Sequence, residues 1–176
     1  EIATLRALPG HQRAVELINY FIQPYHYRTA QLNDDLSSQI LDRYIETMDA
    51  NRSYFLATDI ERFEQMRFHV DDYLRKQELD HIFELFDLYR ERAIDRAEFS
   101  MRILSEGFDL NIPESLRFNR STSPWPIDQA QLDDIWRRRV KNDYLSLKLA
   151  GQPHDDILKT LGDRYRQLSR RTKQIT

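Results

Sequence analysis

The sequence contains no cysteine, and it has only four glycines and six prolines among 176 residues. The lack of cysteine excludes disulfides, thiolate metal ligands and a cysteine nucleophile, although it leaves the cellular compartment open. So few turn-forming residues favour long helices over short strands joined by turns. No stretch approaches the ~20 consecutive apolar residues that a membrane-spanning helix needs.

The composition is that of a globular chain with little net charge. Hydrophobic residues make up 40% of the sequence, charged residues make up 31%, and the formal net charge is -3. This length suffices for one domain with a substantial core, or at most for two small domains. Because the chain has no general basic character, we expect no nucleic-acid partner. No repeat or clear linker is visible, so we predict one helical domain over residues 1–176.

Apolar residues recur at intervals of three and four through most of the sequence, which indicates amphipathic helices. We therefore predict an all-α fold of about five to seven helices. A weak alternation near residues 108–117 leaves room for one short strand. The expected helices cover residues 11–22, 33–50, 59–73, 79–105 and 128–150, with a last helix that begins at 155.

Short polar residues and glycines mark several expected helix ends. Thr58 and Glu61 have the spacing of a capping box, in which each side chain satisfies a free backbone N–H at a helix start. Asp128 is placed to cap the helix that follows it. Gly107 and Gly151 are the expected C-terminal stops of the two helices before them.

Four acidic doublets have the composition of a metal site or of an acid–base pair, but helix structure explains them better. The doublets at 34 and 155 fall in first helical turns, where negative charge meets the positive end of the helix dipole. The doublet at 133 lies four residues before Arg137 and Arg138, so each aspartate is expected to form an i,i+4 ion pair. The doublets are Asp34-Asp35, Asp71-Asp72, Asp133-Asp134 and Asp155-Asp156.

The other residues of possible chemical use form no recognisable enzyme motif. His81 and Glu84 share a helix face, as a metal-binding pair would, but the repeated Glu-x-x-His pairs of a diiron helical bundle are missing. The sequence has no Gly-x-Ser-x-Gly, no phosphate-binding glycine loop and no His-Glu-x-x-His. We therefore expect no catalytic residue, no metal ligand and no cofactor in these 176 residues.

Two basic runs raise the question of a nucleic-acid surface, which needs a continuous cationic face and preferably aromatic side chains for stacking. Acidic residues surround the first run, and Trp136 falls on the apolar side of its helix. We therefore favour solvated helix faces. The runs are Arg137-Arg138-Arg139 and Arg170-Arg171-Lys173.

Aromatic stretches offer candidate points of contact with a partner. Trp125 lies between Pro124 and Pro126, which hold the backbone extended. Such a tryptophan either binds an aromatic-lined groove of a partner or folds back and anchors its own loop, and the second role is favoured. The same alternatives, core contact or exposed partner surface, apply to Tyr54, Phe55 and Leu56 and to Tyr25-His26-Tyr27.

Three segments together resemble a known family. They read ILDRYIETMDANRSYFLATDIERF (40–63), NRSTSPWPIDQAQLDDIWRRRVKNDYLSLKLAG (119–151) and ILKTLGDRYRQLSRRTKQ near the end. The elements MDANRSYFLATDI and SPWP, followed by W, VK and LSLKL, are the most specific. In this order they resemble the N-terminal helical domain of the tail-specific proteases, also called carboxy-terminal processing proteases, of Gram-negative bacteria. The resemblance covers roughly residues 10–176.

The resemblance implies a periplasmic serine endopeptidase that recognises unstructured, apolar C-termini of its substrates. In this family a PDZ domain binds the tail and a serine–lysine dyad cuts it. Both follow the region that resembles this chain, so no catalytic residue is carried over. The helical domain would frame the protease core, and in some members it also meets a lipoprotein adaptor at the outer membrane. The implied partners are therefore the protease core and PDZ domain of the same polypeptide, the adaptor and the protein substrates.

The expected function is a non-catalytic N-terminal scaffold domain of such a protease. The chain starts at Glu1 without a methionine and ends inside the basic pattern QLSRRTKQIT, so we expect a piece of a longer protein. The alternative is a stand-alone helical module that binds a protein through Trp125 or through Tyr54, Phe55 and Leu56. A helical metal-binding protein is a third and weaker interpretation.

Overall fold

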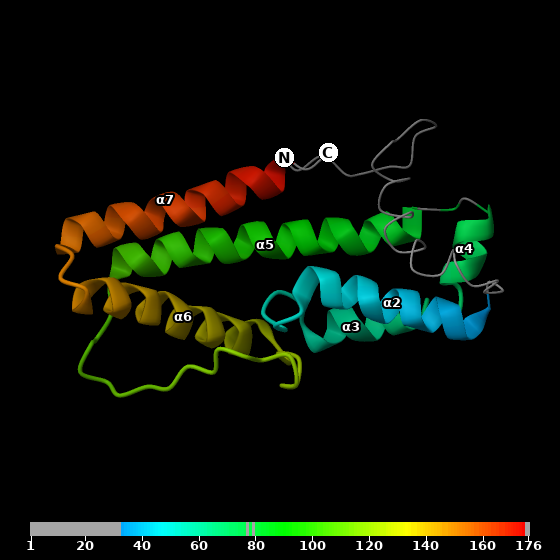
Figure 1. The fold of residues 1–176 in the computed structure, drawn as a ribbon, viewed down its shortest axis with the longest axis horizontal. Helices are drawn as coiled ribbons and strands as arrows, with labels where there is room; N and C mark the ends of the chain where they lie inside the picture. The colour runs from blue at the N-terminus through cyan, green and yellow to red at the C-terminus, as the bar shows by residue number, and fades with distance from the viewer. Residues whose placement is uncertain (1–32, 77, 79, 175–176) are drawn as a thin grey trace. The chain divides into compact units, whose positions relative to one another are not determined.

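The computed structural model describes residues 33–174, except 77 and 79. In this part of the chain there are six helices and no strand, which confirms the predicted all-α fold (Figure 1). The expected helix 11–22 and the aromatic stretch Tyr25-His26-Tyr27 lie outside the described residues. Among the described helices, none combines the length and the hydropathy needed to cross a membrane.

The chain divides into two compact units. Among the described residues, unit 1 takes in 33–50 and 58–88, and unit 2 takes in 51–57 and 89–174. The single domain expected over residues 1–176 stays a prediction.

Helix α2 (Asp34–Asp49) of unit 1 forms as its sequence pattern predicts. Asn33 caps it, because the Asn33 side chain accepts a hydrogen bond of 3.0 Å from the backbone N–H of Leu36. Asp34 and Asp35 occupy the first turn, in agreement with the expected dipole interaction. The predicted apolar stripe is buried and faces α4 (Val70–Lys76); its buried members are Leu36, Ile40, Leu41, Tyr44 and Ile45.

The single helix expected over 59–73 is wrong, because α3 (Ala57–Glu64) ends before a run of turns that leads into α4. A side chain of α2 explains the break. The hydroxyl of Ser37 donates to the carbonyl of Arg67 at 2.7 Å and accepts from the N–H of Val70 at 2.8 Å. A continuous helix would need these backbone groups for its own hydrogen bonds. The Ser37 contact therefore replaces part of the helical ladder.

The capping box expected at Thr58 is also misplaced. Helix α3 begins at Ala57, so Thr58 lies within the first turn and not at the N-cap position. The N–H of Ala57 instead donates to the carbonyl of Pro126 at 2.8 Å. A distant loop thus satisfies one of the free N–H groups at this helix start.

Unit 2 is built around one apolar core. It combines the C-terminal part of α5 (Asp80–Glu106) with α6 (Gln129–Leu149) and α7 (His154–Lys173), and the last two form a helical hairpin (Figure 1). Trp136 and Val140 lie at the centre of the buried face of α6. The buried members of this core are Leu56, Phe99, Leu104, Leu132, Trp136, Val140, Tyr144, Ile157, Leu161 and Tyr165.

The predicted ends of the unit 2 helices are largely confirmed. The carboxylate of Asp128 accepts a hydrogen bond of 2.8 Å from the N–H of Gln131, as a cap should. Gly107 and Gly151 follow α5 and α6 with φ angles of +83° and +85°, which glycine adopts without steric cost. Helix α7 begins at His154, one residue before the expected start.

The strand expected near 108–117 is absent from the described structure. Helix α6 explains why this segment stays irregular. Its Lys141 ammonium donates to the carbonyl of Ile112 at 3.0 Å, and its Arg138 guanidinium donates to the carbonyl of Ser115 at 3.2 Å. Side chains of a helix therefore satisfy carbonyls that would otherwise need a neighbouring strand.

Candidate functional site

The candidate site lies in unit 2, where the loop of residues 107–128 and the short segment 51–57 meet one face of α6. It contains Trp125, Tyr54, Phe55 and Leu56, for which the sequence left two roles open. It also contains two open hollows lined by side chains of the loop and of α6. Its geometry shows which of these side chains are accessible.

Trp125 is half-buried and contacts the 51–57 segment. Its ring centre lies 6.4 Å from that of Phe55, and the guanidinium carbon of Arg52 lies 5.1 Å from the indole centre. Arg52 also donates to the carbonyl of Ser123, two residues before Trp125. These contacts tie the proline-flanked loop to residues 52–55. Whether Trp125 also touches a partner stays a prediction.

Tyr54, Phe55 and Leu56 differ in their accessibility. Phe55 is fully buried at 0% exposure and Leu56 is at 9%, whereas Tyr54 is half-buried. The Tyr54 ring lies 5.3 Å from that of Tyr89 and 5.4 Å from that of Trp136. In this conformation Phe55 contacts only protein, so Tyr54 is the more accessible of the two rings to a partner.

Trp136 holds the same segment from the α6 side. Its indole N–H donates to the carbonyl of Ser53 inside the unit 2 core, and its ring is only 1% exposed. This bond joins residues 83 positions apart in the sequence. The pattern of apolar residues predicted that Trp136 would be buried, but it held no signal for the hydrogen-bond partner.

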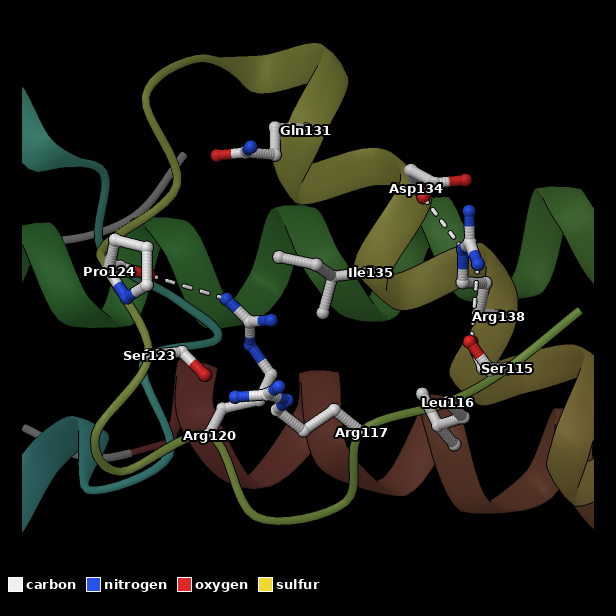
Figure 2. Close-up of a pocket in the computed structure, with 10 residues that line it drawn as sticks. All are labelled: Ser115, Leu116, Arg117, Arg120, Ser123, Pro124, Gln131, Asp134, Ile135 and Arg138. Carbon is white, nitrogen blue, oxygen red and sulfur yellow. Dashed lines mark hydrogen bonds and ion pairs between the residues drawn. The ribbon is translucent and has the colours of Figure 1, made fainter.

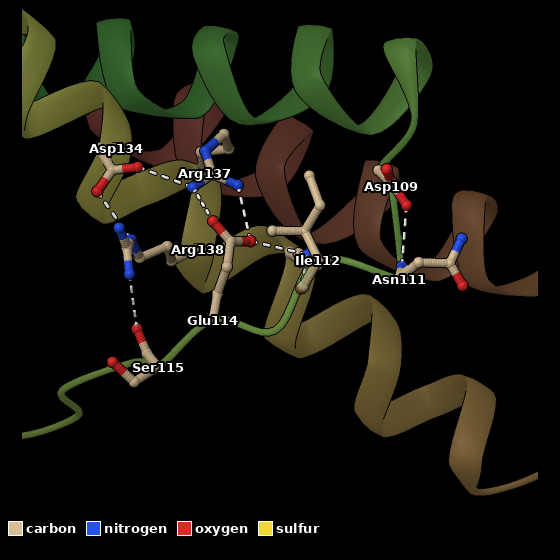
Figure 3. Close-up of polar contacts among 9 residues, drawn as sticks. Asp109, Asn111, Ile112, Glu114, Ser115, Asp134, Arg137 and Arg138 are labelled. Carbon is tan, nitrogen blue, oxygen red and sulfur yellow. Dashed lines mark hydrogen bonds and ion pairs between the residues drawn. The ribbon is translucent and has the colours of Figure 1, made fainter.

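A cluster of charged side chains, which we call the Glu114 cluster, fixes the loop to α6 (Figure 3). Glu114 receives hydrogen bonds from Arg137 and, at 2.7 Å, from Lys141. Asp134 pairs with both Arg137 and Arg138 at 2.8 Å. The cluster consists of Glu114, Asp134, Arg137, Arg138 and Lys141.

The Glu114 cluster lowers the pKa values of its two carboxyl groups. Hydrogen bonds from Arg137 and Lys141 lower the pKa of Glu114 to about 2. Burial opposes ionisation of Asp134, but the hydrogen bonds from Arg137 and Arg138 outweigh it, so the pKa of Asp134 is also lowered. Glu114 and Asp134 therefore stay charged at neutral pH, and neither is suited to donate a proton there.

The expected i,i+4 ion pairs of α6 are half confirmed. Asp134 pairs with Arg138 as predicted, whereas Asp133 pairs with the buried Arg96 of α5. The guanidinium of Arg96 is 1% exposed and also contacts Asp95. A buried cation needs an anionic partner more than an exposed one does, which explains why Asp133 turns toward Arg96.

The larger hollow has a volume of about 410 Å³ and lies between the 115–124 loop and α6 (Figure 2). Leu116, Pro124 and Ile135 supply its apolar wall, and Arg117, Arg120 and Arg138 supply positive charge. The smaller hollow, of about 270 Å³, shares Leu116, Arg117, Arg120 and Ile135 with the larger one. Arg117 and Arg120 are not predictable from the sequence, because isolated arginines in a loop carry no pattern that distinguishes them from ordinary surface residues.

His81 and Glu84, the possible metal-binding pair, contact other residues of the chain. Glu84 pairs with Arg62 at 3.1 Å, and the His81 ring lies 4.6 Å from that of Tyr73. Within the described residues, no three His, Cys, Asp or Glu side chains are grouped so as to hold a metal ion.

The first basic run is occupied by contacts within unit 2. Arg137 and Arg138 belong to the Glu114 cluster, and the guanidinium carbon of Arg139 lies 4.8 Å from the centre of the Trp136 ring. In the second run, Lys173 pairs with Glu98 at 3.3 Å. The run also lies in the last turn of α7, where positive charge meets the negative end of the helix dipole.

Comparisons with a family model and with a curated protein both match tail-specific proteases. A family model of the tail specific protease N-terminal domain matches residues 18–176. A curated protein named tail-specific protease, from Haemophilus influenzae, is 33% identical over 150 residues. That alignment covers 85% of this chain but 22% of the relative, so the chain spans about a fifth of the relative's length.

Proposed function

Because the chain belongs to the tail-specific protease N-terminal domain family, we propose that it is the non-catalytic scaffold of a periplasmic serine endopeptidase. The parent enzyme would process or degrade proteins from their C-termini. The match of residues 18–176 to a model of the N-terminal domain carries this proposal. The proposed partners are the protease core and PDZ domain of the same polypeptide, together with the substrates of the enzyme.

Buried hydrogen bonds between distant residues of unit 2 support a scaffold role, since a scaffold must hold a fixed shape. Trp136, Arg96 and Arg90 are each about 1% exposed. Each forms a hydrogen bond to a residue distant in sequence, namely Ser53, Asp133 and Thr172 respectively. Breaking the Trp136 bond would leave the buried indole N–H without its acceptor, which costs about 1–3 kcal/mol.

A peptidase assay on an unfolded protein substrate tests the non-catalytic role. The purified chain should leave the substrate intact, whereas the parent polypeptide should cleave it. Robust cleavage by the chain alone, surviving repeated purification, would contradict the proposal.

The location can be tested independently of the activity. The parent protein should be released with the periplasmic fraction when cells are opened by osmotic shock. Its retention with cytoplasmic markers would remove the periplasmic part of the proposal and leave the scaffold role in place.

A lipoprotein adaptor at the outer membrane is a further proposed partner, based on the family resemblance. Calorimetric titration of the chain with such an adaptor, with and without Trp125→Ala, would locate the contact. A weaker affinity in the variant would place Trp125 in the interface. An unchanged affinity would restrict Trp125 to anchoring its own loop, and absence of heat with either protein would remove the adaptor from the proposal.

A further inference from the structure

The two hollows beside the 115–124 loop have a charge opposite to that of the whole chain. Five arginines line them, while Asp134 and Asp143 are their only acidic residues. The chain itself carries a formal charge of -3. Clefts lined by one sign of charge concentrate ligands of the other sign. The arginines are Arg117, Arg120, Arg138, Arg139 and Arg164.

Arg117 is the arginine best placed to bind a ligand. Arg138 is held by Asp134, and Arg164 is held by Asp143 at 3.1 Å. Arg117, by contrast, is exposed, and no hydrogen bond, ion pair or ring contact joins its side chain to any described residue. Its guanidinium therefore keeps its five N–H donors for an anion.

Arg120 stands beside Arg117 in a fixed position (Figure 2). Its backbone N–H donates to the side-chain oxygen of Asn51 at 2.7 Å, and one guanidinium nitrogen lies 3.5 Å from the carbonyl of Pro124. Because these contacts hold the backbone of Arg120, the position of its side chain beside the hollow is already restricted. Less freedom is then lost when it binds a ligand.

The larger hollow also has a surplus of neutral donors. The Gln131 side-chain oxygen already accepts from the N–H of Ile127 at 2.9 Å, while its amide nitrogen donates to no described residue. The hydroxyl of Ser123 is buried and likewise has no hydrogen-bond partner among the described residues. Buried donors normally have acceptors. The wall thus favours a ligand that brings oxygen acceptors.

Apolar side chains define the rest of the ligand. Leu116 and Ile135 line both hollows, and Phe118, at 71% exposure, lines the smaller one. A simple inorganic anion would leave this apolar surface in water. An extended peptide that carries both carboxylates and apolar side chains would cover it, and aromatic and arginine side chains are enriched in such contacts.

We propose that these hollows bind an acidic peptide segment. Arg117 and Arg120 would pair with its carboxylates, while Leu116, Ile135 and Phe118 would contact its apolar side chains. This binding role goes beyond the proposed scaffold role and does not depend on it.

Fluorescence anisotropy tests the proposal with a short labelled peptide of alternating glutamate and leucine, acetylated and amidated at its ends. We expect saturable binding that Arg117→Ala weakens by about twofold to fivefold, the range for an exposed charge pair. Arg117→Lys should retain part of the affinity, because it keeps the charge but loses the planar fork. Phe118→Ser should weaken binding while leaving the charge unchanged.

The matched control is Arg170→Ala, which removes the same charge from an exposed position that lines neither hollow. Equal losses in Arg117→Ala and Arg170→Ala would show only general charge attraction and would overturn the proposal. Failure of the glutamate–leucine peptide to bind the original chain would overturn it as well. Circular dichroism of each variant would verify that it is folded.

A second peptide identifies the source of the carboxylate. It alternates glutamine and leucine and has a free C-terminus. Binding of the glutamate peptide would show that the hollows bind the side-chain carboxylates of a peptide. Arg117-dependent binding of the glutamine peptide alone would overturn the acidic segment and assign them to a terminal carboxylate.

Discussion

At the residue scale, Trp136 shows how one buried side chain connects distant parts of unit 2. Its ring packs against Tyr54, and its indole N–H donates to the carbonyl of Ser53. Phenylalanine would keep most of the apolar contact but would remove this buried hydrogen bond. We expect Trp136→Phe to lower the free energy of unfolding by about 1–3 kcal/mol, measured by urea denaturation followed by circular dichroism.

Trp125→Phe, at a half-buried position, is the control for Trp136→Phe. Within the described residues its indole N–H has no hydrogen-bond acceptor, so Trp125→Phe removes ring contacts but no hydrogen bond. Its effect should be the smaller one. Equal losses in the two variants would mean that the Ser53 bond adds nothing to stability.

The Glu114 cluster predicts a pH dependence at the same scale. The folded-state pKa of Glu114 is about 2, below its ordinary value of 4.5. Its folded state therefore binds protons less readily than its unfolded state does. The resulting stabilisation is fully present above pH 4.5 and is lost as the pH falls toward about 2. We expect the free energy of unfolding to decrease through this window.

Glu114→Gln isolates this contribution, because glutamine keeps the shape but cannot ionise. The variant should be less stable than the original chain at pH 7, and the difference should shrink as the pH falls through the window. Urea denaturation at a series of pH values would measure both curves. Curves that stay parallel would show that the Glu114 ion pairs do not contribute to the acid sensitivity.

At the element scale, two glycines should respond oppositely to the same substitution. Gly151 ends α6 with a φ of +85°, which is strained for any residue with a Cβ. Gly162 lies within α7, where the atoms nearest to an added Cβ would be those of the Arg166 guanidinium, the first at 3.3 Å. Arg166 is half-exposed and flexible, so it can move aside.

We therefore expect Gly151→Ala to destabilise the chain by about 1 kcal/mol, and Gly162→Ala to stabilise it by about 0.5–1 kcal/mol through helix propensity. Thermal unfolding of both variants would measure the two shifts. A loss of stability in Gly162→Ala would mean that Arg166 is held in place more firmly than its exposure implies.

Helix boundaries at this scale were predictable where a local residue sets them. Asp128, Gly107 and Gly151 act through their own side chain or backbone freedom, so the sequence places them correctly. The break between α3 and α4 was missed because Ser37, some thirty positions away, takes over the hydrogen bonds of Arg67 and Val70. A pattern of apolar residues records burial but not such a competing partner.

At the scale of the whole molecule, unit 2 depends on the short segment 51–57, which is distant in sequence from much of the core that it joins. Phe55 is its fully buried residue. We expect Phe55→Ala to cost about 3–5 kcal/mol, through lost burial and the cavity left behind. Both tryptophans of the chain lie in unit 2, so their fluorescence in a urea titration should show the loss.

Phe68→Ala is the control, since Phe68 in unit 1 is 53% exposed. It should leave the fluorescence midpoint nearly unchanged. A midpoint that moves as far for Phe68→Ala as for Phe55→Ala would show that unit 2 does not depend on the 51–57 segment in the way proposed.

The sequence by itself determined the all-α class, most of the described helices with their apolar faces, and the family. Helical periodicity, caps and glycine stops are local in the chain, and the family's motifs are contiguous segments. Only the tertiary structure decided which partner each polar group takes: Ser53 for Trp136, Arg96 for Asp133, and Glu114 for Arg137 and Lys141. The reason is that a buried polar group must bond to whatever the fold brings within reach, and that choice leaves no periodic trace in the sequence.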